Sequence, residues 1–267
     1  MKKIIGLILA IITIVGCVFA FAACGEKETT ETLQVYTNAG FAPFEYVNDN
    51  GKVVGVDIDV MNYIGKKLGY KVIINDIQFE NILPQVQSNK FAVGAAGMSK
   101  TDERDKVALA SVVYATSVQY VIAPNGTFAE NAVVTLDQVL AAANKIGVQS
   151  GTTGQYMIED YIDEVNEDEE TPDVTNKTVE YSNAIVASQD IGTATCQAVI
   201  IDELPAKSIS AANDKLSCWK IDVDPESYVL YFNKEATELV EEVNKVLEKM
   251  IKDGTINQYI MNHSNGN

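Results

Sequence analysis

The chain has 267 residues, of which 21% are charged, and its formal net charge is −17 at pH 7. This acidic balance excludes nucleic acid as a partner, because phosphate backbones bind basic surfaces, and it is typical of a soluble domain. The single histidine, His263, lies near the C-terminus, and the single arginine is Arg104. A histidine-based triad, a histidine-rich metal site and a cofactor are therefore not expected.

The first residues have the pattern of an export signal. Lys2 and Lys3 precede an apolar run, Ile4–Ala23, which closes on small residues before Cys24. A charged start, an apolar middle and small residues before a cleavage point indicate a signal peptide over residues 1–23. A transmembrane helix stays open as the alternative, since about 20 apolar residues can span a bilayer.

The sequence Phe21-Ala22-Ala23-Cys24 resembles the lipobox of bacterial lipoproteins. The resemblance implies cleavage before Cys24 and attachment of lipid, such as palmitate, to its thiol. Residues 24–31 are short and polar, so we expect them to form a tether between the anchor and the folded domain. Loss of Lys2 and Lys3 with the signal would take the net charge from −17 to −19.

From Thr32 onward, strand-like alternation and helix-like spacing of apolar residues follow one another. The pattern first predicts a strand at 33–37, a hairpin turn at 46–51, a helix at 56–68, a strand at 71–74, a helix at 81–88, a strand at 92–96 and a helical stretch opening at 101. It then predicts strands at 118–123, 145–148, 179–181, 198–202 and 228–232, with helices at 136–143, 155–165, 183–192 and 235–252 between and after them. Strands alternating with helices predict an α/β protein with mostly parallel sheets.

Two further features of the sequence are an acidic stretch and a pair of cysteines. Glu164–Glu170 is strongly acidic, but it lacks the ligand spacing and central glycine of a calcium loop, so we expect a solvated excursion. Outside the N-terminal segment the cysteines are Cys196 and Cys218. Their spacing alone leaves open whether they form a disulfide.

Four segments of the sequence together resemble the polar amino acid-binding proteins of ABC transporters, solute-binding family 3. They are Phe41–Tyr46 followed by Gly55–Asp59; Phe79–Pro84 with Gly97–Arg104; Gln149–Thr153 with Ala198–Pro205; and Val243–Lys245 with Asp253–Ile256. Their order and spacing cover Thr32 to His263, and this makes the resemblance specific.

The resemblance implies a two-lobed periplasmic-binding-protein-like α/β fold of type II, with a ligand cleft between the lobes. Lobe 1 is then expected at 32–113 and 229–267, and lobe 2 at 119–223. Two crossing strands, at 114–118 and 224–228, would act as the hinge. We expect the protein to be a monomer.

A free amino acid is a zwitterion, so its binding site needs donors for the carboxylate and acceptors for the ammonium. Arg104 matches the carboxylate-clamping arginine of the family, because a guanidinium offers two parallel N–H donors. The alternative is a surface arginine paired with Asp102 or with a helix neighbour. The backbone of Thr152 and Thr153, where a loop enters a helix, matches the second carboxylate contact. Ordinary N-capping by threonine is compatible with that role.

The ammonium side of the site is implied by the same resemblance. Asp202, at the end of a buried strand, matches the aspartate that accepts the ammonium, with a helix cap as the alternative. Gly97 through its carbonyl and Ser99 through its hydroxyl supply further acceptors, with Ala96 beside them. Ser99 can also donate to the carboxylate.

The side chain of the ligand is expected to lie between Phe41 and Phe79, which match two aromatic residues that sandwich it. Asn38 and Gln149 occupy positions that tune side-chain preference. Relatives that prefer cationic ligands often have aspartate where this chain has Asn38, and Ile201 offers no polar group. These residues favour a neutral ligand.

The predicted function is a lipid-anchored extracytoplasmic receptor that binds a free amino acid by lobe closure and hands it to the permease of an ABC importer. Two alternatives remain. The first is an enzyme on a related fold, such as a prephenate or arogenate dehydratase, which would need a positioned proton donor. The second is an amino acid sensor that does not serve transport.

Overall fold

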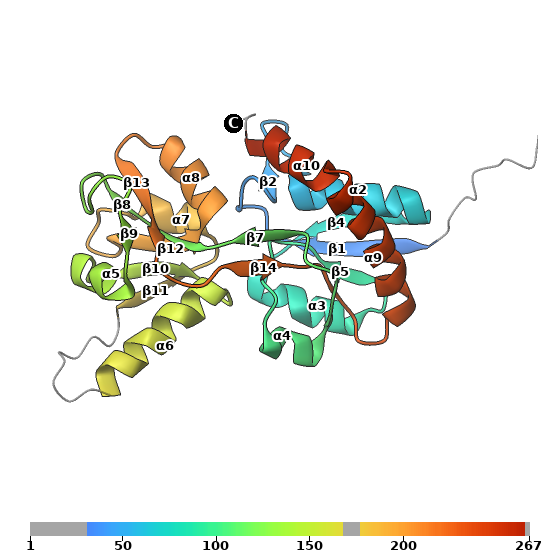
Figure 1. Cartoon of the computed structure of the whole chain (residues 1–267), viewed down its shortest axis with the longest axis horizontal. Helices are drawn as coiled ribbons and strands as arrows, with labels where there is room; N and C mark the ends of the chain where they lie inside the picture. The colour runs from blue at the N-terminus through green and yellow to red at the C-terminus, as the bar shows by residue number, and fades with distance from the viewer. Residues whose placement is uncertain (1–30, 168–176, 265–267) are drawn as a thin grey trace, which may run out of the picture.

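A computed structural model describes residues 31–167 and 177–264 of the chain. They form two α/β lobes that lie side by side and are linked by two extended segments (Figure 1). The predicted signal peptide, Cys24 and the tether up to residue 30 lie outside the described residues, and so does the end of the acidic stretch predicted at Glu164–Glu170. None of the helices in the described ranges is long and apolar enough to cross a membrane.

The first lobe is built on a five-stranded sheet. Its strands, in spatial order, are β4 (Lys71–Asp76), β1 (Thr32–Thr37), β5 (Ala92–Gly94), β15 (Tyr231–Phe232) and β6 (Leu109–Ala110). Strand β1 is parallel to β4 and β5, whereas β15 is antiparallel to its neighbours. The segment between β1 and β4 contains a short hairpin, β2 (Tyr46–Val47) and β3 (Val53–Val54).

Helices cover this first sheet. They are α2 (Val56–Leu68), η1 (Phe79–Asn81), α3 (Ile82–Ser88), α4 (Asp102–Val107), α9 (Thr237–Lys252) and α10 (Thr255–Ser264). Helix α9 buries Leu239, Val243 and Leu247, whose spacing of four residues makes one apolar face. Helix α2 ends at Gly69, which has a left-handed φ of 80° that favours glycine.

The second lobe has a six-stranded sheet. Its strands, in spatial order, are β11 (Thr178–Tyr181), β10 (Ile146–Gln149), β12 (Ala198–Asp202), β8 (Gln119–Pro124), β13 (Leu216–Ile221) and β9 (Val133–Val134). Its helices are α5 (Leu136–Ala142), α6 (Thr153–Glu167), α7 (Ala184–Gln189) and α8 (Glu203–Ala211). The parallel strands β10 and β12 end at Gln149 and Asp202, so the carboxyl ends of both strands lie at one edge of the sheet.

Two antiparallel strands link the lobes, β7 (Ala115–Ser117) and β14 (Glu226–Tyr228), and Figure 1 shows them running between the two sheets. Glu226 pairs with Ser117 and Tyr228 with Ala115. Each lobe has its own apolar core on its own sheet. The chain therefore leaves the first lobe through β7 and returns through β14.

Most predicted elements are present, with their ends shifted by a few residues. The strand predicted at 228–232 is divided between β14 and β15, because the chain passes there from the linking pair into the first sheet. Strands β6, β9 and β13 and helices α8 and α10 were not predicted. Cys196 is buried and Cys218 half-buried, and both are free thiols, so the disulfide left open by the sequence is not formed.

Candidate functional site

One small cavity between the lobes brings together every residue predicted to bind ligand. Its lining comprises Asn38, Phe41, Phe79, Ala96, Gly97, Ser99, Arg104, Gln149, Thr152, Thr153 and Asp202, together with Glu45. The first seven of these residues belong to the first lobe, and the next four to the second. The free space among them is about 20 Å³, roughly the room that one water molecule needs. The lobes are therefore closed on each other, and an amino acid needs them to separate before it can enter.

Arg104 is buried at the centre of this site. Its short helix, α4, begins after Thr101, whose hydroxyl accepts the backbone N–H of Arg104 at 3.2 Å. The guanidinium donates from Nη1 to the Ser99 carbonyl at 2.8 Å and from Nη2 to the Gly151 carbonyl at 3.1 Å. It lies 5.3 Å from the ring centroid of Phe79, a cation–π contact.

Only 7% of Arg104 is exposed, so the alternative of a surface arginine paired with Asp102 is wrong. Burial lowers the pKa of its guanidinium, and the nearby Tyr231 and Glu226 oppose that shift. A guanidinium remains charged in proteins, so a fixed positive charge bridges the two lobes at this point.

The loop before α6 supplies the facing side of the site. Thr152 caps this helix, because its hydroxyl accepts the backbone N–H of Gln155 at 3.2 Å and donates to the Gln149 carbonyl at 2.8 Å. Thr153 is the first residue of α6. The N–H groups in the first turn of a helix have no intrahelical carbonyl partner, and they bind anions well. The predicted capping and the predicted anion-binding position are therefore compatible.

Asp202 is a second buried charged group in the lining of the cavity. Its carboxylate accepts the Tyr228 hydroxyl at 2.6 Å and the Gln119 amide at 3.3 Å, and only 9% of the residue is exposed. It occupies the N-cap position of α8 but makes no side-chain capping bond, so its carboxylate does not cap the helix. Burial, and then the charge of Glu226, raise the pKa of Asp202 to about 7.

Gly97 is held in a conformation that only glycine tolerates well. Its φ is 52°, and an added Cβ would lie 2.6 Å from the ring of Phe41. The backbone N–H of Gly97 donates to Asp57 at 2.8 Å, and the Tyr114 hydroxyl donates to the same carboxylate at 2.6 Å. Asp57 is fully buried. This network explains why the loop that contains Gly97 and Ser99 keeps its position beneath the Phe41 ring.

The Gln149 amide donates to the Asn38 side-chain oxygen at 2.9 Å, which joins the lobes at a second point. Glu45 lies in the same cavity, is only 1% exposed, and has its Oε2 atom buried without a hydrogen-bond partner. Burial, followed by the charges of Asp57 and Asp202, raises its pKa well above the ordinary value. An unpartnered buried carboxyl is costly, so a donor group of a ligand would find a partner there.

Sequence reasoning missed Glu45, Gln119 and Glu226 as members of the site. Glu45 stands inside the motif Phe41–Tyr46, but motif position alone does not show that its carboxyl turns inward. The Gln119 amide donates to Asp202 and, at 3.1 Å, to Glu226. Gln119 and Glu226 lie on or beside the linking strands, where no sequence pattern marks a binding residue.

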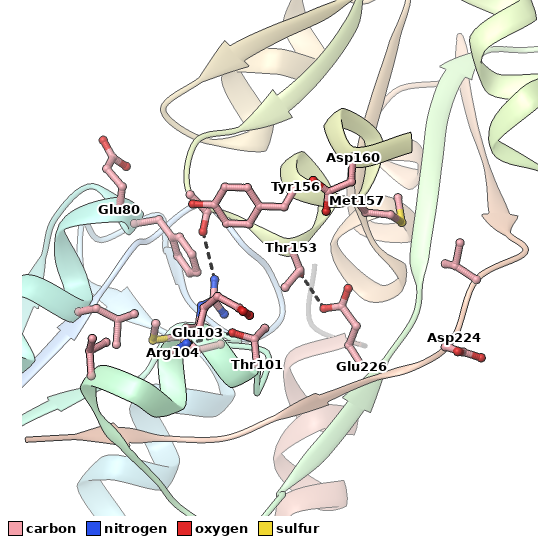
Figure 2. Close-up of a pocket in the computed structure, with 16 residues that line it drawn as sticks. Glu80, Thr101, Glu103, Arg104, Thr153, Tyr156, Met157, Asp160, Asp224 and Glu226 are labelled. Carbon is pink, nitrogen blue, oxygen red and sulfur yellow. Dashed lines mark hydrogen bonds between the residues drawn. The ribbon is translucent and has the colours of Figure 1, made fainter. Parts of the chain in front are cut away.

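A second, larger cavity of about 540 Å³ adjoins the first and shares Phe79, Arg104 and Thr153 with it. Figure 2 shows this cavity, with Thr153 between Arg104 and Glu226 and its hydroxyl turned toward Glu226. Within residues 31–167 and 177–264, no group of histidine, cysteine, aspartate and glutamate side chains is arranged to hold a metal ion.

Comparison with known proteins identifies the fold and the class of site. Residues 33–264 match the family described as bacterial extracellular solute-binding proteins, family 3. The chain belongs to this family. This match confirms the predicted family and the two-lobed fold, and the family is one of binding proteins.

Individual members of the family are similar over most of their length. A putative ABC transporter arginine-binding protein 2 of Escherichia coli K12 is 27% identical over 230 residues, which cover 84% of this chain and 87% of the relative. The structure of the substrate-binding protein AbpA from Streptococcus pneumoniae bound to L-arginine aligns with a TM-score of 0.76 and 28% identity, covering 88% of this chain and 94% of AbpA. An ancestral arginine-binding protein bound to glutamine aligns with a TM-score of 0.75 and 30% identity, covering 88% and 98%.

Proposed function

We propose that this family 3 protein captures one free amino acid between its lobes and delivers it to the permease of an ABC importer. The observation that carries the proposal is the buried Arg104, which lies in one interlobe cavity with the carboxylate of Asp202. One group suits a carboxylate and the other an ammonium, so the cavity complements the two charges of a zwitterion. The relatives named as binding proteins of amino acid transporters support the same conclusion.

The carboxylate of the ligand would bind the guanidinium of Arg104 and the backbone N–H groups of Thr152 and Thr153. The ammonium would bind Asp202 and the acceptor oxygens around Gly97. These groups come from both lobes, so only the closed arrangement satisfies both ends of the ligand at once. Ligand binding would therefore shift the population toward closure about the strands at 114–118 and 224–228. No bond is made or broken in this mechanism.

The unpartnered oxygen of Glu45 favours a ligand whose side chain ends in a nitrogen donor. This group includes the amide of glutamine, in keeping with the neutral ligand that Asn38 favours. It also includes the guanidinium of arginine, which the names of relatives point to. The two cases differ in the charge of Glu45, which an arginine side chain would hold ionised.

A thermal-shift panel of the twenty proteinogenic L-amino acids tests the proposal. A ligand at a hundredfold excess over its Kd is expected to raise the Tm by about 5–10 °C, because it binds only the folded state. L-Glutamine, L-arginine or L-lysine is expected to give a larger shift than L-leucine, which has no side-chain donor. If no amino acid raises the Tm, amino acid capture is wrong. Turnover of prephenate would instead favour the enzymatic alternative.

We further propose that the protein is anchored on the outer face of the cell membrane through a lipid on Cys24. Metabolic labelling with palmitate should label the wild type and leave a Cys24→Ala variant unlabelled. A Cys218→Ala variant, which loses a thiol of the folded lobe, serves as the matched control and should keep the label. An unlabelled wild type, or a labelled Cys24→Ala variant, would contradict the anchor.

A further inference from the structure

The carboxylate of Glu226 joins three parts of the molecule. Glu226 is the first residue of the linking strand β14 and is half-buried. It accepts hydrogen bonds from the hydroxyl of Ser99 in the first lobe, from the hydroxyl of Thr153 in the second lobe at 2.8 Å, and from the Gln119 amide at 3.1 Å. Figure 2 shows the bond from Thr153. A single carboxylate on a linking strand thus takes one donor from the first lobe and two from the second.

The number of protons on these groups determines whether the two hydroxyls can donate a hydrogen bond to a ligand or only accept one. A serine or threonine hydroxyl has one proton to donate, and an ionised carboxylate can only accept. While Ser99 and Thr153 donate to Glu226, their oxygens have only lone pairs left. Both residues also line the small cavity, and their hydroxyl oxygens lie 3.5 Å apart. Toward the cavity they are therefore acceptors, which suit an ammonium and not a carboxylate.

We propose that Glu226 is a positioning residue for recognition of the ligand ammonium, because it holds the hydroxyl protons of Ser99 and Thr153 away from the cavity. The inference rests on the amino acid capture proposed above. It assigns the ligand carboxylate to Arg104 and backbone N–H groups alone. Of the two roles expected for Ser99, acceptance from the ammonium is kept and donation to the carboxylate is excluded. Glu226 itself does not line the small cavity.

The charge of Glu226 also acts on Asp202. The Gln119 amide donates to both carboxylates, and the charge of Glu226 is the second cause, after burial, of the raised pKa of Asp202. The other charged or titratable groups facing this pair are Arg104, Glu45 and the Tyr228 hydroxyl. Glu226 thus concentrates negative charge behind the position where the ammonium would bind.

The test is a Glu226→Gln variant titrated with each of the twenty proteinogenic L-amino acids at pH 8, where Asp202 is mostly ionised in both proteins. Glutamine keeps the size of the side chain, but its amide donates a proton and frees a hydroxyl proton to turn toward the cavity. Binding of the cognate amino acid is expected to weaken about 10- to 100-fold. The matched control is Asp222→Asn, which removes the same charge from an exposed side chain four residues away, outside the linking strands, and should bind as the wild type does.

Two further readouts separate positioning from a structural effect. For the deamino analogue of the cognate amino acid, which lacks the ammonium, the wild type and Glu226→Gln should bind equally. The pH midpoint of amino acid binding should fall in Glu226→Gln, because one cause of the raised Asp202 pKa is gone. A Glu226→Asp variant, which restores the acceptor, should recover part of the affinity.

The outcomes separate this inference from the proposed function. A wild type that binds no amino acid would overturn amino acid capture and this inference with it. If the wild type binds and Glu226→Gln matches it at pH 8, the inference about Glu226 is wrong and capture stands. An equal loss of affinity for the amino acid and its deamino analogue would likewise show that Glu226 does not act through the ammonium.

Discussion

An Arg104→Ala variant is expected to bind its amino acid about 100- to 1,000-fold more weakly, a loss of about 3–4 kcal/mol of binding free energy. The ligand carboxylate would enter a buried site without its positive partner, and an unpaired buried charge is expensive. Alanine also removes the hydrogen bond to the Gly151 carbonyl, which joins the lobes in the closed arrangement, and the bond to the Ser99 carbonyl within the first lobe. Isothermal calorimetry with the amino acid found by thermal shift measures the effect.

The control for this variant is Lys106→Ala in the same helix. Lys106 pairs with Glu103 at the surface, so its loss removes one positive charge without changing the cavity. An Arg104→Lys variant keeps the charge but loses the planar fork, and we expect an intermediate loss of affinity. Circular dichroism must show that each variant is folded. If a folded Arg104→Ala protein has the affinity of the wild type, Arg104 does not bind the ligand carboxylate.

The fold was predictable from the sequence where local patterns and tertiary contacts agree. The apolar positions of 56–68 and 235–252 follow the helical period, and α2 and α9 are present there. The strand at 198–202 contains a continuous apolar run, 198–201, and becomes the fully buried β12. The prediction of one strand at 228–232 is wrong, because Val229 and Leu230 lie between two short strands of different sheets. The apolar pattern records their burial but not the change of sheet.

The lining of the site was also predictable, because the motif residues are placed by the ends of neighbouring strands. Gln149 ends β10 and Asp202 ends β12, so parallel pairing brings them to one edge. Glu45, Gln119 and Glu226 could not be found in this way. Their importance depends on side-chain direction and on the proximity of the two linking strands, which are far apart in sequence. Neither is encoded in a local pattern of residue types.

An Asp202→Asn variant is the second change with a large expected effect. At pH 8 it should bind the amino acid about 100-fold more weakly, because the ammonium exchanges a charged acceptor for a neutral amide. Binding to the wild type should itself weaken as the pH falls. With a pKa of about 7, Asp202 is mostly protonated at pH 6, so the affinity there should be about 10-fold lower than at pH 8. Over this range the affinity of the variant should stay nearly constant.

The stability of the ligand-free protein is expected to change in the opposite direction. The folded pKa of Asp202 lies above the ordinary value of 3.8, so folding disfavours its ionised form. Protonated Asp202 therefore contributes to the free energy of unfolding below about pH 4, and this contribution is lost as the pH rises through about 7. The Asn side chain cannot ionise, so the Tm of Asp202→Asn relative to the wild type should rise between pH 4 and pH 8.

Asp222→Asn, an exposed substitution of the same type in the second lobe, should show neither the weaker binding nor the gain in Tm. Weaker binding together with higher stability would mean that Asp202 is kept ionised for the ligand at a cost to the empty protein. If Asp202→Asn lowers the Tm at pH 8 and binds as the wild type does, the carboxylate is structural. The ammonium would then need another acceptor, for which Glu45 is the remaining buried carboxyl in the cavity.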